Sequence, residues 1–191
     1  MLQIFRLRVV FIFILIALGF VCLMLGFKFM VVLSCWALAI LLSLGYIFFG
    51  TVNGAMFALN SGKAEQAEQL LSQTINPKLL LNSHKAYYFF TKGLIQLYKV
   101  NQTQNEDLIR NLLNEAETDL NQSLSYGLKR KSERAMAYLN LSHIAFRKKD
   151  KPNLFLYLEK TRDNQTEDIR LEQSIQELEQ AILKVYGSQE S

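Results

Sequence analysis

Uncharged apolar residues fill most of the first 50 positions of the chain. Residues 9–27 form a run of 19 positions without a charged side chain, and residues 29–49 form another run of 21. A helix rises about 1.5 Å per residue, so each run would be roughly 30 Å long, which matches the hydrocarbon core of a bilayer. Backbone groups in lipid must find hydrogen bonds within their own segment, so the pattern predicts two transmembrane helices. Because only a short turn around Lys28 separates them, they would form a hairpin over residues 1–50.

A secretory signal peptide would also place basic residues, here Arg6 and Arg8, ahead of an apolar run. That alternative is weaker, because the run is long and no small-residue cleavage site follows it. Arg6, Arg8 and Lys63 flank the outer ends of the hairpin, whereas the loop holds only Lys28. The positive-inside rule therefore predicts an integral membrane protein with two spans whose following domain lies in the cytoplasm.

Beyond residue 50, apolar residues recur at the steps of three and four that are typical of amphipathic helices, without strand-like alternation. Pro77 and Pro152 are the only prolines, and both stand where a helix pair would turn or begin. The predicted fold class is therefore all-α. The expected helices are 54–60, 63–75, 83–99, 106–126, 131–148, 152–162 and 167–186. Because residues 29–59 contain no proline, we also expect the second apolar helix to run unbroken into the helix at 54–60.

Two of the expected helices share a pattern, in which Phe89 and Tyr138 are each followed four positions later by a small residue, Gly93 or Ser142. The helices beside them repeat a packing triplet, at Ala67, Leu71 and Thr74, at Ala116, Leu120 and Ser123, and at Leu154, Leu158 and Thr161. These patterns resemble the tetratricopeptide-repeat family, whose helix pairs stack into a solenoid. The triplets begin at residues 67, 116 and 154, against a family period of about 34, so the middle repeat would carry an insertion. The resemblance implies helical repeats over residues 51–166.

One apolar stripe marks the last expected helix. Its residues recur at steps of four and three, with Glu and Gln on the other face: Leu171, Ile175, Leu178, Ile182 and Val185. A repeat array needs a polar cap at its end, so we interpret residues 167–191 as a capping helix and tail. A coiled coil would show the same spacing, but it usually needs three or four heptads, and only about two are present.

Charged residues are distributed unevenly between the two parts of the chain. The first 50 residues hold only Arg6, Arg8 and Lys28, whereas all 17 acidic residues follow, together with the other 18 basic residues. The net charge of +4 thus arises mostly beside the apolar runs, where basic residues meet lipid head groups, so we expect membrane lipid and no nucleic acid as a partner. Cys22 and Cys35 both lie in the apolar runs, which excludes a disulfide framework in the rest of the chain.

The sequence does not predict an enzyme. His84 and His143 are far apart along the chain, and no metalloprotease, phosphate-loop or nucleophile-elbow motif accompanies them. The acidic residues between 106 and 119 scatter over several faces of one helix, as solvated side chains do. We therefore expect no catalytic residue, no metal, no cofactor and no small-molecule substrate.

The family resemblance also implies a concave groove lined by the first helix of each repeat. In the family's register its lining would be Tyr87, Phe90, Leu94, Leu139, His143 and Arg147. Because most of these side chains are apolar, an apolar helix of a protein partner would suit the groove. Two other interpretations remain open. The same side chains could form the core, or the C-terminal helix could fill the groove.

Two functions fit these observations. The leading hypothesis is a membrane-anchored scaffold that binds a protein or peptide partner through its helical repeats. In the alternative, the protein is an accessory subunit of a larger membrane complex and acts through its apolar hairpin.

Overall fold

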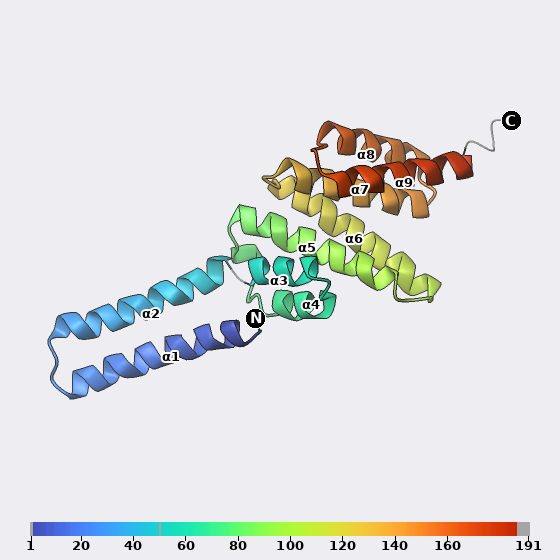
Figure 1. Cartoon of the computed structure of the whole chain (residues 1–191). Helices are drawn as coiled ribbons and strands as arrows, with labels where there is room; N and C mark the ends of the chain where they lie inside the picture. The colour runs from blue at the N-terminus through green and yellow to red at the C-terminus, as the bar shows by residue number, and fades with distance from the viewer. Residues whose placement is uncertain (1, 50, 187–191) are drawn as a thin grey trace. The chain divides into compact units, whose positions relative to one another are not determined.

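The computed structural model describes residues 2–49 and 51–186, and the side chains of all of these except residues 2–9 and 46–48. Within the described residues the chain forms nine α-helices, one short 3₁₀ helix and no strand (Figure 1). The predicted all-α fold class is confirmed. The chain divides into two compact units, residues 1–91 and 92–191, with the boundary inside helix α5 (Asn82–Val100).

Helices α1 (Leu2–Met24) and α2 (Phe29–Phe49) of the first unit pack against each other. The indole of Trp36 on α2 covers Gly19 on α1, where even a methyl group would collide with the ring. The Phe20 and Trp36 ring centroids lie 5.5 Å apart. Helix α2 coincides with the second apolar run that predicted a membrane span, whereas α1 begins before the first run and ends within it. Over the part of the chain that the structure describes, no helix has both the length and the apolarity needed to cross a membrane.

Helices α3 (Val52–Asn60) and α4 (Ala64–Ser72) form a second packed pair in this unit, followed by the 3₁₀ helix η1 (Pro77–Leu79). The predicted unbroken helix from α2 into α3 is wrong. Thr51 has φ −103° and ψ 9°, outside helical geometry, and stands at the N-cap of α3; residue 50 lies outside the described residues. The fully buried Thr51 hydroxyl donates to the carbonyl oxygen of Leu70 and lies 3.2 Å from Thr74 Oγ1. These bonds join the start of α3 to α4 and its C-terminal end. They connect residues far apart in the sequence, so local helix propensity does not predict them.

Local signals set the ends of the helices in the second unit, α6 (Glu106–Tyr126), α7 (Lys131–Arg147), α8 (Lys151–Asp163) and α9 (Ile169–Tyr186). Asn105 caps α6 by accepting a hydrogen bond from the Leu108 N–H at 3.1 Å, and Asp150 caps α8 by accepting one from the Asn153 N–H at 3.3 Å. Helix α6 ends at Tyr126, and its C-cap is Gly127, whose φ of 87° favours glycine. The observed bounds therefore lie within a few residues of the predicted ones.

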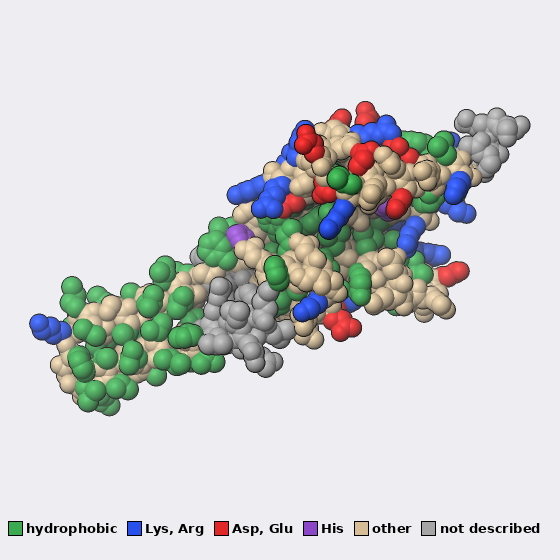
Figure 2. Space-filling view, in the orientation of Figure 1, with side chains coloured by type: hydrophobic (Ala, Val, Ile, Leu, Met, Phe, Trp, Pro, Cys, Tyr) green, Lys and Arg blue, Asp and Glu red, His purple; other side chains and the backbone are tan. Residues whose placement is uncertain are grey.

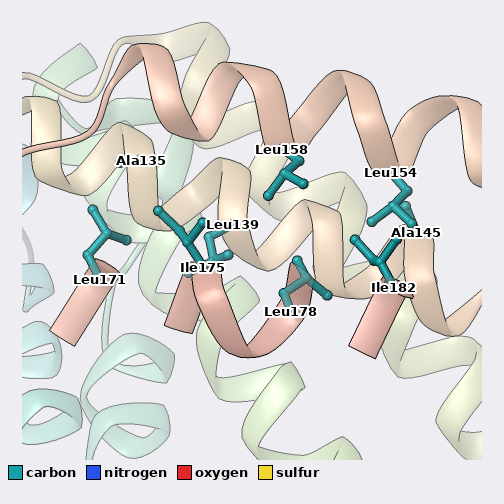
Figure 3. Packing of buried hydrophobic residues seen from close by; sticks show 9 residues of the cluster. All are labelled: Ala135, Leu139, Ala145, Leu154, Leu158, Leu171, Ile175, Leu178 and Ile182. Carbon is teal, nitrogen blue, oxygen red and sulfur yellow. The ribbon is translucent and has the colours of Figure 1, made fainter. Parts of the chain in front are cut away.

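The core of the second unit joins α7, α8 and α9 (Figure 3). Four of the five stripe residues of α9 are buried in it, beside Leu154 and Leu158 of α8. The fifth, Val185, is half exposed and lies outside the core. Helix α9 therefore presents its apolar stripe to α7 and α8, as its periodicity predicts.

The three packing triplets quoted from the sequence are buried at every position. In the second unit, Gly93 shows why small residues are needed. A Cβ built on Gly93 would lie 3.0 Å from Leu120 Cγ and 3.3 Å from the Ala116 carbonyl oxygen. Helix α5 thus approaches α6 more closely than a larger side chain would permit.

One arginine joins two loops of the second unit. Arg134 donates from Nε to Asn164 Oδ1 at 2.9 Å, and from Nη1 to the carbonyl oxygens of Leu128 at 2.9 Å and Lys129 at 3.0 Å. These bonds tie the α6–α7 loop to the end of α8. The guanidinium is therefore a structural group with acceptors inside the protein.

We predict that Arg134→Ala lowers the free energy of unfolding by about 1.5–3 kcal/mol, because it leaves charge-assisted acceptors unpaired. Arg130→Ala is the matched control, since the Arg130 side chain is 78% exposed. Urea denaturation followed by circular dichroism compares the two variants. Equal midpoints for both would contradict the structural role of Arg134.

Candidate partner-binding groove

A pocket of about 260 Å³ lies among α5, α6 and α7 of the second unit. We call it the central pocket. Its floor is apolar and its rim carries amide, imidazole and guanidinium groups, from Leu97, Asn101, Leu113, Asn140, His143, Ile144 and Arg147. Because the volume lies below the roughly 300–1,000 Å³ of small-molecule sites, the pocket suits a side chain of a larger ligand.

A second, wider hollow of about 450 Å³ adjoins the central pocket. We call it the basic pocket, because three of its lining residues are cationic and one is acidic: Glu106, Ile109, Arg110, Leu113, Asn114, Arg147 and Lys148. Leu113 and Arg147 line both pockets. The two hollows are therefore adjacent, and we call them together the α6–α7 groove.

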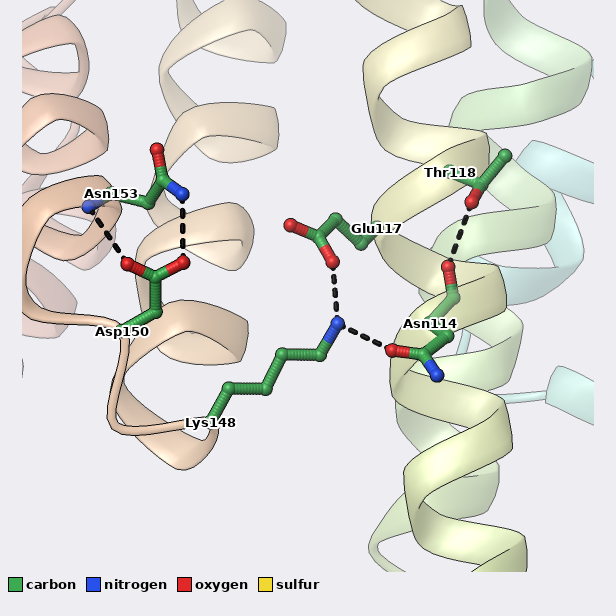
Figure 4. A network of polar contacts seen from close by, with 6 residues as sticks. All are labelled: Asn114, Glu117, Thr118, Lys148, Asp150 and Asn153. Atoms are coloured by element: carbon green, nitrogen blue, oxygen red, sulfur yellow. Dashed lines mark hydrogen bonds and ion pairs between the residues drawn. The ribbon is translucent and has the colours of Figure 1, made fainter.

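The end of α7 positions the cations of the groove. Arg147 is the last residue of α7 and donates from Nη2 to Asn101 Oδ1 at 2.9 Å. Lys148 follows, and its Nζ donates to Asn114 Oδ1 at 2.6 Å and pairs with Glu117 (Figure 4). The charge of Lys148 is therefore compensated within the protein. The acceptor of the Arg147 hydrogen bond, by contrast, is the neutral amide of Asn101.

His143 lies on the rim of the central pocket and is half buried. Burial lowers the pKa of its imidazole, the positive charge of Arg147 lowers it further, and Glu177 on α9 opposes both effects. At neutral pH the ring is therefore neutral, and it offers one N–H donor and one nitrogen acceptor.

The six residues predicted to line a partner groove have different environments. Tyr87 and Phe90 belong to the first unit, where Tyr87 is half buried and Phe90 is buried. In the second unit Leu94 is half buried, and Leu139 is only 5% exposed within the core that includes α9. His143 and Arg147 line one pocket together. Leu139 therefore offers little surface to a partner, and the groove as a binding site stays a prediction.

Sequence reasoning missed several residues of the α6–α7 groove. Asn140 precedes His143 by three positions and Arg147 by seven, so a search for polar residues at helical steps would have found it. Asn101 and Arg110 carried no such signal. Asn101 follows α5 in a polar stretch, and Arg110 belongs to the charged helix expected at residues 106–126.

A separate polar cluster lies between α5 and α6. Asp119 is 5% exposed, and Lys92 Nζ lies 3.1 Å from its Oδ2 and donates to Oδ1 at 3.3 Å. Gln96 Nε2 donates to Glu115 Oε2 at 2.9 Å. Burial raises the pKa of the Asp119 carboxyl, and the ion pair and hydrogen bonds from Lys92 and Gln96 only partly oppose this rise.

A raised pKa in the folded state makes the Asp119 contribution to stability greatest when the carboxyl is protonated. That contribution is present below about pH 4 and is lost as the pH rises through the raised pKa. We predict that the free energy of unfolding of the natural protein, minus that of Asp119→Asn, falls with rising pH over this window. Urea denaturation at a series of pH values measures the difference. Lys92→Met removes a group that opposes the rise of the Asp119 pKa, so in that background the fall in stability should continue to higher pH. A difference between the natural protein and Asp119→Asn that does not depend on pH would contradict the prediction.

The fold and the groove define an all-helical protein whose helices pack in pairs and whose second unit bears a partly basic groove. No family model, no curated protein and no solved structure matches the chain.

Proposed function

We propose that the protein is a membrane-anchored scaffold without catalytic activity, which binds a protein or peptide partner through a tetratricopeptide-like array of helices. The single observation that supports this function best is the central pocket. Three helices bring polar groups around an apolar floor there, an arrangement suited to recognising a side chain of a bound segment.

The anchor is the α1–α2 hairpin. Large apolar side chains are exposed along both helices, among them Phe13, Phe20, Ile40 and Leu41. Hydrophobic side chains dominate the face of the hairpin seen in Figure 2, which carries a basic side chain at its far end, whereas most charged side chains lie over the helices that follow. Contiguous apolar surface of this kind is unfavourable in water and favourable in lipid. The proposal of two membrane spans thus rests on this surface and on the uncharged runs of the sequence.

The repeat array is supported by the buried triplets and by the close approach of Gly93 to α6. Helix α9 would cap it, since its apolar stripe is buried while Gln173, Gln176 and Glu177 are exposed. We place the array in the cytoplasm from the basic residues that flank the hairpin. A C-terminal reporter that is active only outside the cytoplasm should therefore remain inactive.

A second candidate function is an accessory subunit that acts through the hairpin. The supporting observation is an apolar hollow of about 460 Å³ lined by Ile16, Phe20, Trp36, Ala39, Ile40, Ser43 and Leu44. Beside it, Trp36 Nε1 is buried without a hydrogen-bond acceptor. A helix of a larger membrane complex could fill the hollow.

Site-specific photocrosslinking in native membranes tests both functions on the full chain. A photoreactive residue replaces Asn140 in the central pocket, Ile40 beside the hairpin hollow, or Gln122 on an exposed face of α6 as the control. Capture of one partner from Asn140 and not from Gln122 is the expected result. Capture from Ile40 alone would favour the accessory subunit, and release of the chain by carbonate extraction would overturn the membrane anchor.

A further inference from the structure

The α6–α7 groove carries an imbalance of charge above an apolar floor. We propose that it binds an acidic peptide segment of the partner, in which carboxylate side chains flank one large apolar side chain. This inference rests on the proposed scaffold function and specifies the chemistry of its ligand.

Two guanidinium groups on the groove are not neutralised. Arg110 and Arg147 are exposed, and neither forms an ion pair within the described part of the chain. Lys148, by contrast, is paired with Glu117. Glu106 is the only acidic residue in the lining, so the groove presents uncompensated positive charge to a ligand. Charge complementarity therefore favours an anionic occupant.

The neighbours of Arg147 favour a carboxylate as the anionic group. A guanidinium binds a carboxylate through two parallel hydrogen bonds. Asn101 already accepts one hydrogen bond from Arg147 Nη2, which orients the group on the rim. The amide of Asn140 and the neutral imidazole of His143 offer further donors in the central pocket.

The floor of the groove favours an apolar side chain between the acidic ones. Ile109 and Leu113 line the basic pocket, and Leu113 and Ile144 line the central pocket. Alternate side chains of an extended peptide point to the same side, roughly 6.6 Å apart, so one segment can address both hollows.

Fluorescence anisotropy with three synthetic peptides tests the inference on the full chain in detergent micelles. All peptides have acetylated and amidated ends, so that only side chains carry charge. The first is Gly-Ser-Asp-Glu-Leu-Glu-Asp-Ser-Gly. The second replaces its acidic residues with Asn and Gln, and the third replaces its leucine with Ser. We expect the first peptide to bind tightest, and each change to weaken binding on the order of tenfold.

Variants of the protein identify the site of binding. Arg110→Met and Arg147→Met should each weaken the acidic peptide on the order of tenfold and reduce the salt dependence of its affinity. Arg130→Met, on an exposed side chain outside the groove, should leave binding unchanged. Arg110 lies on an exposed position of α6, so its variant should retain the thermal unfolding of the natural protein.

Several results would overturn the inference. These are equal affinity for the acidic and neutral peptides, no binding of the acidic peptide up to about 1 mM, and equal loss of binding in the Arg130 control. Self-association of the chain that Arg147→Met abolishes would assign the groove to a second copy instead. If the Asn140 crosslink captures a partner whose contact segment lacks acidic residues, the ligand chemistry is wrong but the scaffold function stands.

Discussion

Replacing Leu154 with alanine is expected to lower the free energy of unfolding of the protein by about 2–5 kcal/mol. Leu154 is fully buried in the core that joins α7, α8 and α9, so truncation removes apolar contacts and leaves a cavity (Figure 3). The decrease in the free energy of unfolding should lie near the upper end of this range if α9 cannot move inward to fill the cavity. Urea denaturation of the full chain, followed by circular dichroism, measures it.

Leu156→Ala is the matched control for this prediction. Leu156 lies on the same helix and is 44% exposed, so the same chemical change there removes little buried surface. We expect its effect to stay within about 0.5 kcal/mol. If both variants lose the same stability, the cost reflects helix propensity or the unfolded state. The packing of Leu154 in the core with α7 and α9 is then contradicted.

The second large effect is expected at Gly93. Gly93→Leu should lower the free energy of unfolding by about 1–3 kcal/mol or more, because the new side chain must displace Leu120 and the backbone of Ala116. A double-mutant cycle with Leu120→Ala isolates the clash. Truncating Leu120 opens space in front of position 93, so the two substitutions together should cost less than the sum of their separate effects.

Gly93→Ala separates the clash from backbone effects. Alanine gains about 1 kcal/mol of helix propensity over glycine, but its Cβ would stand 3.0 Å from Leu120 Cγ. We expect the gain in helix propensity and the cost of the close contact nearly to cancel, so that Gly93→Ala changes the free energy of unfolding little. A clear stabilisation by Gly93→Ala, together with additive costs for Gly93→Leu and Leu120→Ala, would show that α5 and α6 are not in close contact at this point.

Helix existence and bounds could be predicted from the sequence because their causes are local. The periodicity of residues 106–126 and the capping side chains Asn105 and Asp150 act within a few positions along the chain. The stripe of α9 likewise identified the face that is buried, apart from Val185 at its end. Such features depend on 3.6-residue periodicity and on the unpaired groups at helix ends.

The break at Thr51 could not be predicted in the same way. Gly50 and Gly54 each disfavour a continuous helix by about 1 kcal/mol, but they do not place a break at Thr51. The buried hydrogen bonds of Thr51 are made to Leu70 and Thr74, which lie 19 and 23 positions away. A distant acceptor can outweigh local helix propensity, which is worth only about 1 kcal/mol per residue or less.

The composition of the α6–α7 groove was also decided by tertiary packing. The register of the resembled family identified His143 and Arg147, but Asn101 and Arg110 join them only because α5, α6 and α7 meet in space. The same packing removed Leu139 from the surface, since α9 shares its core. The sequence alone thus determined the helices and their apolar faces, through short-range periodicity and capping. Which polar side chains share a pocket depended on contacts between residues far apart in the chain, and only the tertiary structure could decide it.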